Sequence, residues 1–332
     1  MVLAGVSGLS SAAIAAIDFQ GRWHTPGREF FHFIRLWMYW SQWALLLWIP
    51  VLVVVAVRIQ LNRIQKALMA FVLMGSSLWA WAGLVEPHML LERHTRLTLP
   101  EATAPSVRIA VVADIHWGLF VRDWQVERLV QRLQSLSVDA VVVAGDWTYE
   151  PPRDLDRGFS PFKRLQVPVF AVLGNHDVEQ PGPPLSQDLR AALIRQGIQL
   201  VEGQVLPWRG WTVVGLDDLW GGQPDRQIAR IWSEKRSNVL LVTHQPDTIT
   251  LLPEGAFQLA LAGHTHGGQI QLPWLTERVL QRTLRNPWYD GLFSTAAGPL
   301  FVTSGIGMIG LPMRLRVPPR IEVLTLETGR AS

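Results

Sequence analysis

The longest hydrophobic segments of the chain are two uncharged stretches near its N-terminus. Residues 36–57 run for 22 positions without a charged side chain, and residues 67–85 do so for 19. Each stretch is long enough to cross a bilayer core of about 30 Å as a helix that rises about 1.5 Å per residue. Tryptophan and tyrosine side chains gather near one end of each stretch, as at membrane–water interfaces. The pattern predicts a transmembrane hairpin over residues 36–85 and disfavours two buried helices of a soluble core.

The connection between the two stretches is basic, with Arg58, Arg63 and Lys66 and no acid. The positive-inside bias places such a loop in the cytoplasm and both flanks of the hairpin outside. Arginines on those flanks leave the opposite orientation open. Residues 1–35 begin with an apolar segment that lacks the positive region of a secretory signal. We interpret that segment as a weak, membrane-associated helix.

Beyond a polar linker over residues 86–106, short apolar runs alternate with amphipathic segments. The runs that predict strands are residues 108–113, 138–144, 168–173, 212–216, 239–243, 258–262, 300–303 and 321–326. The amphipathic segments predict helices at about residues 123–137, 186–196 and 225–235. Strands that alternate with helices predict a layered α/β domain over residues 107–327.

Composition narrows the function classes further. The chain has no cysteine, which excludes disulfides, thiolate metal sites and cysteine nucleophiles. Its formal net charge of +3 comes from the first 100 residues, where 8 Lys and Arg face 4 Asp and Glu. The remainder, with 22 basic and 23 acidic residues, lacks the basic excess of a nucleic-acid-binding domain. We therefore expect no nucleic-acid partner, and no protein partner can be inferred.

The predicted strands end in polar side chains at five places. These are Asp114 and His116 after the first strand, Asp146 after the second, Asn175, His176 and Asp177 after the third, His244 after the fifth, and His264 and His266 after the sixth. Residues two apart in an extended chain project to the same side, which brings paired side chains into one cavity. Because sites in α/β sheets form at the carboxyl ends of strands, we expect these residues to meet at one edge.

Neutral imidazole and carboxylate are ligands suited to Mn, Fe and Zn. Two such ions close together need a ligand that binds both, and an aspartate can do so through its two oxygens. Taken singly, Asp146 also fits a helix cap, Asn175 a turn and His244 an ordinary loop histidine. Five such clusters in succession favour a centre with two divalent metal ions.

The polar clusters belong to longer sequence motifs. In chain order these are Asp-Ile-His-Trp-Gly, Gly-Asp, Leu-Gly-Asn-His-Asp, Thr-His-Gln-Pro-Asp and Gly-His-Thr-His-Gly-Gly-Gln. In this order they resemble the calcineurin-like metallophosphoesterase superfamily, and in particular its bacterial branch of membrane-tethered phosphodiesterases. The resemblance covers about residues 107–327. It implies two facing β-sheets flanked by helices, which here follow the transmembrane hairpin.

The resemblance also implies roles for individual residues. Asp114, His116 and His266 would bind one metal ion, Asn175, His244 and His264 the other, and Asp146 both. His176 would act at the scissile bond, with Asp177 as its orienting partner. Relatives often carry a further acid after the second motif, but Glu150 is a poor positional match and its role stays unassigned. Arg314 is a candidate for binding a substrate phosphate, although a surface salt bridge accounts for it equally well.

Together these features predict a phosphodiesterase or pyrophosphatase anchored in the bacterial inner membrane that uses a metal-bridging hydroxide on a phosphoester. The bilayer is the expected partner, and UDP-2,3-diacylglucosamine of lipid A biosynthesis is the named candidate substrate. That nucleotide sugar is cytosolic, which conflicts with a catalytic domain outside the cytoplasm. Either the substrate or the predicted orientation must therefore be wrong. The alternatives are a broader envelope phosphodiesterase or phosphomonoesterase, and an inactive membrane scaffold that retains the fold.

Overall fold

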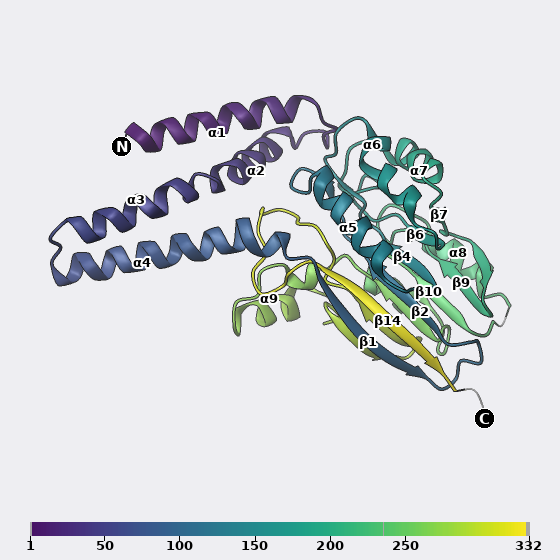
Figure 1. Ribbon diagram of the computed structural model, residues 1–332. Coiled ribbons are helices and arrows are strands. Elements are labelled where there is room, and N and C mark those ends of the chain that lie inside the picture. Colours follow the sequence, from purple (N-terminus) through teal and green to yellow (C-terminus); the bar gives the residue numbers. More distant parts are fainter. Residues whose placement is uncertain (1, 235, 330–332) are drawn as a thin grey trace.

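A computed structural model describes residues 2–234 and 236–329, in which an α/β domain carries a projecting arm of helices (Figure 1). Two six-stranded sheets form the centre of the domain. The first sheet has the order β1 (Leu91–Leu99), β14 (Arg320–Thr328), β2 (Val107–Val112), β4 (Ala140–Ala144), β6 (Val169–Val172) and β7 (Gln199–Leu200). The second has the order β12 (Gly291–Thr295), β13 (Gly298–Val302), β11 (Leu259–Ala262), β10 (Val239–Val242), β9 (Trp211–Gly215) and β8 (Val205–Trp208).

The central strands of both sheets are parallel. In the first sheet Val111 pairs with Val142 on β4, and Val142 pairs with Phe170 on β6. The second sheet repeats the arrangement with β9, β10, β11 and β13. A parallel pair of two-residue strands, β3 (Trp117–Gly118) and β5 (Thr148–Tyr149), lies beyond the first sheet. Parallel strands end at the same edge, so the loops that follow them converge.

Helices cover the outer faces of the sheets, and apolar side chains fill the space between them. Ile109, Val142 and Phe170 of the first sheet belong to the same buried cluster as Leu240 and Phe301 of the second. Strands buried on both faces read as continuous apolar runs, which is why the sequence reveals them. The outer helices are α5 (Asp123–Ser135), α6 (Leu155–Phe159), η3 (Ser160–Arg164) and α7 (Ser186–Arg195) on the first sheet, and α8 (Pro224–Ile231) and η4 (Pro246–Leu251) on the second. The predicted α/β layers are confirmed.

Several elements have no counterpart in the sequence-based prediction. Residues 86–106, expected to be a linker, contain β1, which pairs in parallel with β14 at the edge of the first sheet. In β1 only Leu97 and Leu99 are buried, so the strand lacks an apolar run. β8, β12 and α9 (Leu275–Thr283) likewise lie at the periphery. Few of their side chains are buried, so their sequences show little hydrophobic pattern.

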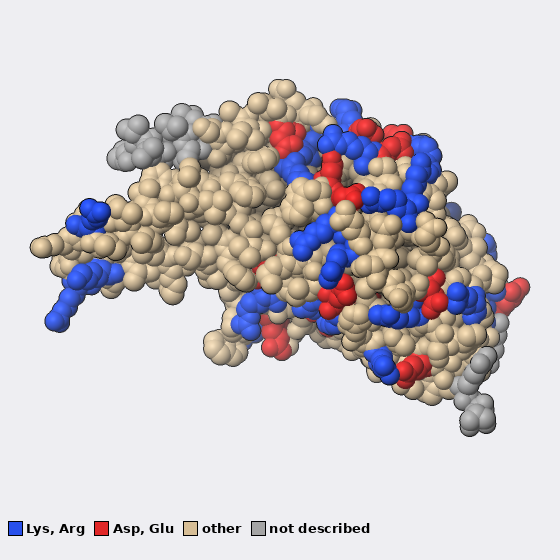
Figure 2. Space-filling view, viewed as in Figure 1, with Lys and Arg blue, Asp and Glu red and all other residues tan. Residues whose placement is uncertain are grey.

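Four helices form the arm: α1 (Val2–Gln20), α2 (Glu29–Gln42), α3 (Leu45–Arg58) and α4 (Arg63–Ala80). The last continues through η1 (Trp81–Val85) and η2 (Glu86–His88) as one apolar helical segment of 26 residues. Among the described residues this helix alone is long and apolar enough to cross a membrane, while α2 and α3 qualify only as a pair bent by 48°. On the visible face of the arm, charged side chains gather mainly at its far end (Figure 2).

The bend divides the predicted first span of residues 36–57 between α2 and α3. Leu36 and Tyr39 of α2 pack against Phe120 and Met308 of the α/β domain. The buried side chain of Gln42 donates a hydrogen bond of 2.9 Å to the carbonyl of Pro312. The first part of the predicted span therefore packs partly against protein, although Trp37 and Trp43 are exposed, and further exposed apolar side chains follow on α3 and α4.

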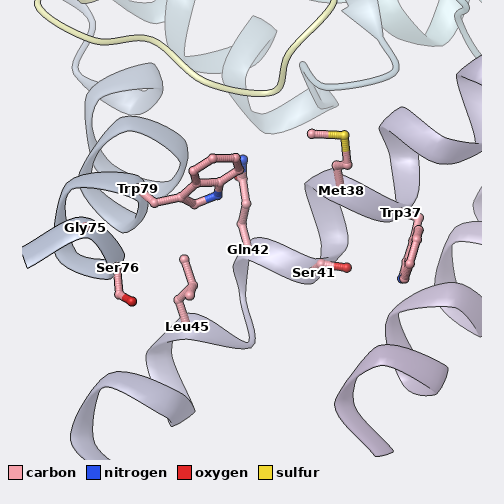
Figure 3. A pocket seen from close by; sticks show the side chains of 8 residues that line it. All are labelled: Trp37, Met38, Ser41, Gln42, Leu45, Gly75, Ser76 and Trp79. Atoms are coloured by element: carbon pink, nitrogen blue, oxygen red, sulfur yellow. The ribbon is translucent and has the colours of Figure 1, made fainter. Parts of the chain in front are cut away.

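A cavity of about 500 Å³ lies where α2, α3 and α4 diverge (Figure 3). Its lining residues are Trp37, Met38, Ser41, Gln42, Leu45, Gly75, Ser76 and Trp79. Trp79 and Gln42 point toward the same space from different helices. The bend after α2 thus separates the part of the arm that packs on the domain from the part that projects away from it.

Candidate metal centre

The polar residues predicted at five strand ends lie together where the carboxyl ends of the two sheets meet. Five of them adopt left-handed backbone conformations: Asp114 (φ 52°), His116 (φ 50°), Asp146 (φ 53°), His264 (φ 72°) and His266 (φ 52°). Such conformations cost roughly 1–3 kcal/mol each and persist only where the surrounding structure fixes them. They turn each side chain sharply out of its strand and into the shared space.

Asp114, His116 and His266 form a first group of donors whose facing atoms lie close together. The Nδ1 of His116 donates to the carbonyl of Thr148 at 3.2 Å, which leaves its Nε2 free to accept. That Nε2 lies 3.0 Å from the Nε2 of His266, which in turn lies 3.7 Å from Oδ1 of Asp114. One proton between two imidazole nitrogens satisfies both only in part, whereas a metal ion accepts both lone pairs.

Asp146, His244 and His264 form a second group, which Asn175 completes. The Nδ1 of His244 lies 2.8 Å from the carbonyl of Ala144, so that ring nitrogen donates and Nε2 faces the site. Three atoms surround this Nε2: Oδ1 of Asn175 at 3.1 Å, Nδ1 of His264 at 3.2 Å and Oδ2 of Asp146 at 3.2 Å. A single proton on Nε2 can be donated to only one of them.

Asp146 lies between the two groups. Its Oδ2 is 3.2 Å from Nε2 of His244 and 3.5 Å from Nε2 of His116. Its Oδ1 accepts a hydrogen bond of 3.0 Å from the backbone N–H of His176. The carboxylate is thus held in one orientation, with an oxygen directed at donors of both groups.

Burial and charge set the protonation of these groups. Burial lowers the pKa of His116 and of His264 to about 3, and that of His266 well below its ordinary value. Burial opposes ionisation of Asp146, but the charges of His244 and His176 hold its pKa well below the usual range. Neutral imidazole and ionised carboxylate are the forms that bind metal ions.

Two further groups, Asp114 and His244, have raised pKa values. Burial raises the pKa of Asp114 to about 7, and a nearby cation would favour its ionised form. Burial disfavours the charge on His244, yet Asp146 raises the pKa of that imidazole to about 10. Donor separations of 3.0–3.7 Å suit atoms that surround an ion at bond lengths of about 2.0–2.2 Å. The residues fit divalent metal ions.

His176 lies beside these groups rather than among them. Its ring centroid is 5.3 Å from that of His116 and 5.3 Å from that of Tyr149. Its side chain is partly exposed, unlike the fully buried His116 and His244. The imidazole of His176 therefore borders the donors at the point where the site opens.

The structure corrects the predicted role of Asp177 as the orienting partner of His176. The buried carboxylate of Asp177 accepts from the backbone N–H groups of Trp147 (2.9 Å), Gly174 (3.0 Å) and Thr148 (3.0 Å), and from the hydroxyl of Thr148 (2.8 Å). It turns away from His176 because these N–H groups otherwise lack acceptors in the loop. Asp177 instead positions Thr148, whose carbonyl orients the ring of His116.

Arg314 also differs from its predicted role in binding substrate phosphate. Its guanidinium is completely buried and donates to the carbonyls of Gly307 (2.8 Å), Val317 (2.9 Å) and Ser304 (3.0 Å). Its Nη2 lies 3.5 Å from Nδ1 of His266. Arg314 thus packs behind His266, where it supports a ligand position and is shielded from substrate.

A groove beside the metal centre contains residues that no sequence motif marks. Its volume is about 580 Å³, and its lining residues are Thr25, Pro26, Arg28, Glu179, Gln180, Pro181, Gly182, Pro184 and Trp220. The ring of Trp220 stands edge-on to His264 at 4.8 Å. Arg28 comes from the N-terminal segment, far from every motif, so only the docking of the arm reveals it.

Comparisons with known proteins agree with this geometry. The profile of the family described as calcineurin-like phosphoesterase matches residues 107–268. The chain is 28% identical to the "Uncharacterized metallophosphoesterase YkuE" of Bacillus subtilis (strain 168), over 79% of this chain and 94% of that one. It is 28% identical to the "Phosphodiesterase YaeI" of Escherichia coli (strain K12), over 71% and 87%. It is 25% identical to the "UDP-2,3-diacylglucosamine pyrophosphatase LpxG" of Chlamydia muridarum (strain MoPn / Nigg), over 69% and 87%.

Proposed function

This chain belongs to the calcineurin-like phosphoesterase superfamily and is a metal-dependent phosphoester hydrolase, and from that premise we propose that it is a membrane-anchored phosphodiesterase or pyrophosphatase with two metal ions. The observation that carries the proposal is the position of Asp146, whose Oδ2 lies 3.2 Å from His244 and 3.5 Å from His116. A carboxylate held between two donor groups is the ligand that a dinuclear centre requires.

In this proposal Asp114, His116 and His266 hold one ion, Asn175, His244 and His264 the other, and Asp146 both. Manganese, iron or zinc suits this set of nitrogen and oxygen donors. When bound, such a pair activates water as a nucleophile and neutralises charge on phosphoryl oxygens. Protein side chains must then supply proton donation and substrate binding at the reaction centre.

His176 supplies the proton-bearing group. Its backbone N–H is fixed on Asp146 at 3.0 Å, and its ring packs against those of His116 and Tyr149. The imidazole therefore borders the reacting phosphate with little freedom to move. From there its ring N–H donates to the leaving oxygen as the ester bond breaks.

The groove beside the centre favours a substrate with an anionic group and an apolar part. Arg28 offers a guanidinium for a phosphate, while Trp220 offers an aromatic wall next to His264. Both the groove and the arm involve the N-terminal segment, so the substrate meets the centre close to the helices. We infer an amphiphilic phosphodiester or pyrophosphate. UDP-2,3-diacylglucosamine, which the Chlamydia relative's name supports, is the candidate for the opposite orientation, in which the domain faces the cytoplasm.

Turnover of bis-p-nitrophenyl phosphate by the detergent-purified chain tests the hydrolase proposal. We expect chelation to abolish release of p-nitrophenolate and added Mn²⁺, Fe²⁺ or Zn²⁺ to restore it, because the ligand residues alone cannot activate water. Mixing the substrate with the same ions but without protein gives the background rate. Release that persists after complete removal of metal would contradict the proposal, and a metal-loaded protein without turnover would favour the scaffold alternative.

The arm supports anchoring in the bacterial inner membrane. Apolar side chains of α3 and α4 are exposed along the arm, among them Leu47, Val54, Phe71 and Met74. Exposed surface of this extent is costly in water and favourable in lipid. Arg58 ends α3 and Arg63 begins α4, so basic residues flank the loop at the far end of the arm (Figure 2). We propose that α3 and α4 enter the bilayer with this loop in the cytoplasm and the α/β domain outside.

Reporter fusions test this orientation. Alkaline phosphatase fused after residue 329 should be active and green fluorescent protein at the same place dark, because the first folds only outside the cytoplasm and the second only within it. Fusions after residue 61, at the tip of the arm, provide the opposite pattern as control. A fluorescent C-terminal fusion would reverse the orientation and place the site in contact with cytosolic nucleotide sugars.

A further inference from the structure

A second cluster of metal-binding side chains lies where the connection between α1 and α2 meets the end of β5. It consists of His24, His32 and Glu150, whose donor atoms all lie within 4.8 Å of one another. Nε2 of His32 is 3.3 Å from Oε1 of Glu150, and Nδ1 of His24 is 3.8 Å from Oε2. The side chains of His32 and Glu150 are 2% and 1% exposed and that of His24 is 18% exposed, so the cluster is largely shielded from solvent.

The tautomer of His24 leaves a lone pair directed into this cluster. Its Nε2 lies 2.9 Å from the carbonyl of Phe19, which can only accept, so Nε2 carries the hydrogen. Its Nδ1 is buried and has no hydrogen-bond partner among the described residues. A metal-binding histidine usually donates its other ring N–H to a carbonyl or carboxylate, as Nε2 of His24 does to Phe19.

Glu150 is likewise held for ligation. The backbone N–H of Thr25 donates to its Oε2 at 2.9 Å, and the hydroxyl of Thr25 donates to Oε1. These bonds fix the plane of the carboxylate with both oxygens toward the histidines. Burial raises the pKa of Glu150 to about 7, and a cation beside it would offset that penalty.

We propose that Nδ1 of His24, Nε2 of His32 and the carboxylate of Glu150 form a third metal site, suited to Zn²⁺, that fastens the N-terminal segment to the α/β domain. Zinc takes two imidazoles and a carboxylate at about 2.0–2.2 Å, which separates tetrahedral ligands by about 3.4 Å. The separations of 3.3 and 3.8 Å between histidine and glutamate atoms bracket that value. The site lies outside the dinuclear centre and does not depend on the proposed reaction.

The position of Tyr149 connects this site to the dinuclear centre. Tyr149 precedes Glu150 in the chain, and its ring centroid lies 6.1 Å from that of His32, 5.6 Å from that of His116 and 5.3 Å from that of His176. Its hydroxyl accepts a hydrogen bond of 2.7 Å from Arg35 of α2. Binding of the third ion therefore fixes the aromatic wall against which His176 packs.

The alternative is a metal-free cluster in which protonated Glu150 donates to Nε2 of His32. Counting bound zinc separates the two cases. The full chain is purified in detergent, stripped with a chelator and dialysed against Zn²⁺, and the bound ions are counted by native mass spectrometry. We expect three per chain in the wild type and two in His24→Ala and His32→Ala. His94→Ala, whose side chain is 53% exposed on β1, should keep all three.

The same counts distinguish this proposal from the dinuclear one. If the dinuclear centre did not exist, the wild type would bind one ion and the two variants none. Equal counts in the wild type and both variants would overturn the third site. Because a variant can misfold, zinc-edge anomalous diffraction from wild-type crystals gives an independent result. A peak among His24, His32 and Glu150 supports the site, and a peak only at the dinuclear centre overturns it.

Discussion

Replacing Asp146 with asparagine should lower kcat for bis-p-nitrophenyl phosphate by about 1,000-fold or more. The carboxylate is buried between two groups of donors, with Oδ2 at 3.2 Å from His244 and 3.5 Å from His116. An amide has the same shape, but it carries no charge and presents one oxygen instead of two. Its NH₂ group cannot bind a cation. The substitution therefore removes the shared ligand and leaves the fold around it nearly unchanged.

Metal content separates the loss of a ligand from the loss of the fold. We expect Asp146→Asn to bind fewer metal ions in the dinuclear centre than the wild type. Asp188→Asn, at an exposed position on α7, is the matched control and should keep both rate and metal content. Thermal unfolding of the stripped proteins reports whether either substitution perturbs the fold. A stable Asp146→Asn protein with wild-type turnover would exclude Asp146 from the reaction centre.

The sequence predicts the centre of this protein better than its periphery, for a physical reason. Central parallel strands such as β4 and β10 are buried on both faces, so each is a continuous apolar run. The polar residue after such a run stands at the sheet edge, and the structure brings Asp146 and His244 together there. The edge strand β1 buries only Leu97 and Leu99 and therefore resembles a linker in sequence.

Side-chain direction is harder to predict than position along the chain. Asp177 follows His176 directly, yet its carboxylate turns to the N–H groups of Trp147, Thr148 and Gly174. Arg314 looks like a phosphate ligand in sequence, but three backbone carbonyls hold it inside the protein. Both choices follow from unsatisfied backbone groups that exist only once the loops have folded.

Contacts between the arm and the domain cannot be predicted from local sequence patterns. Thr25 and Glu150 are 125 positions apart and hydrogen-bonded. Their meeting depends on the packing of Leu36 and Tyr39 of α2 against the domain, which also engages the first residues of the predicted first span. The arm thus does more than anchor the chain, because it completes a groove and a cluster beside the reaction centre.

His176→Ala should separate chemistry from metal binding. His176 lies beside the donors, with its ring 5.3 Å from that of His116, and none of its side-chain atoms belongs to either donor group. We expect kcat for an alkyl phosphodiester to fall by about 100-fold or more, since general acid catalysis contributes on that scale. Metal content should stay at the wild-type value. The expected outcome differs from that for Asp146→Asn, in which metal content and turnover decline together.

The choice of leaving group makes the role of His176 testable. If its ring N–H protonates the leaving oxygen, the loss must be larger for an alkyl phosphodiester than for a p-nitrophenyl ester, whose phenolate departs without a proton. A purely structural histidine would reduce both rates equally. His94→Ala on the exposed edge strand controls for removal of an imidazole. Equal losses for the two esters would leave His176 as a packing residue between His116 and Tyr149, whereas unequal losses place the proton transfer on its ring.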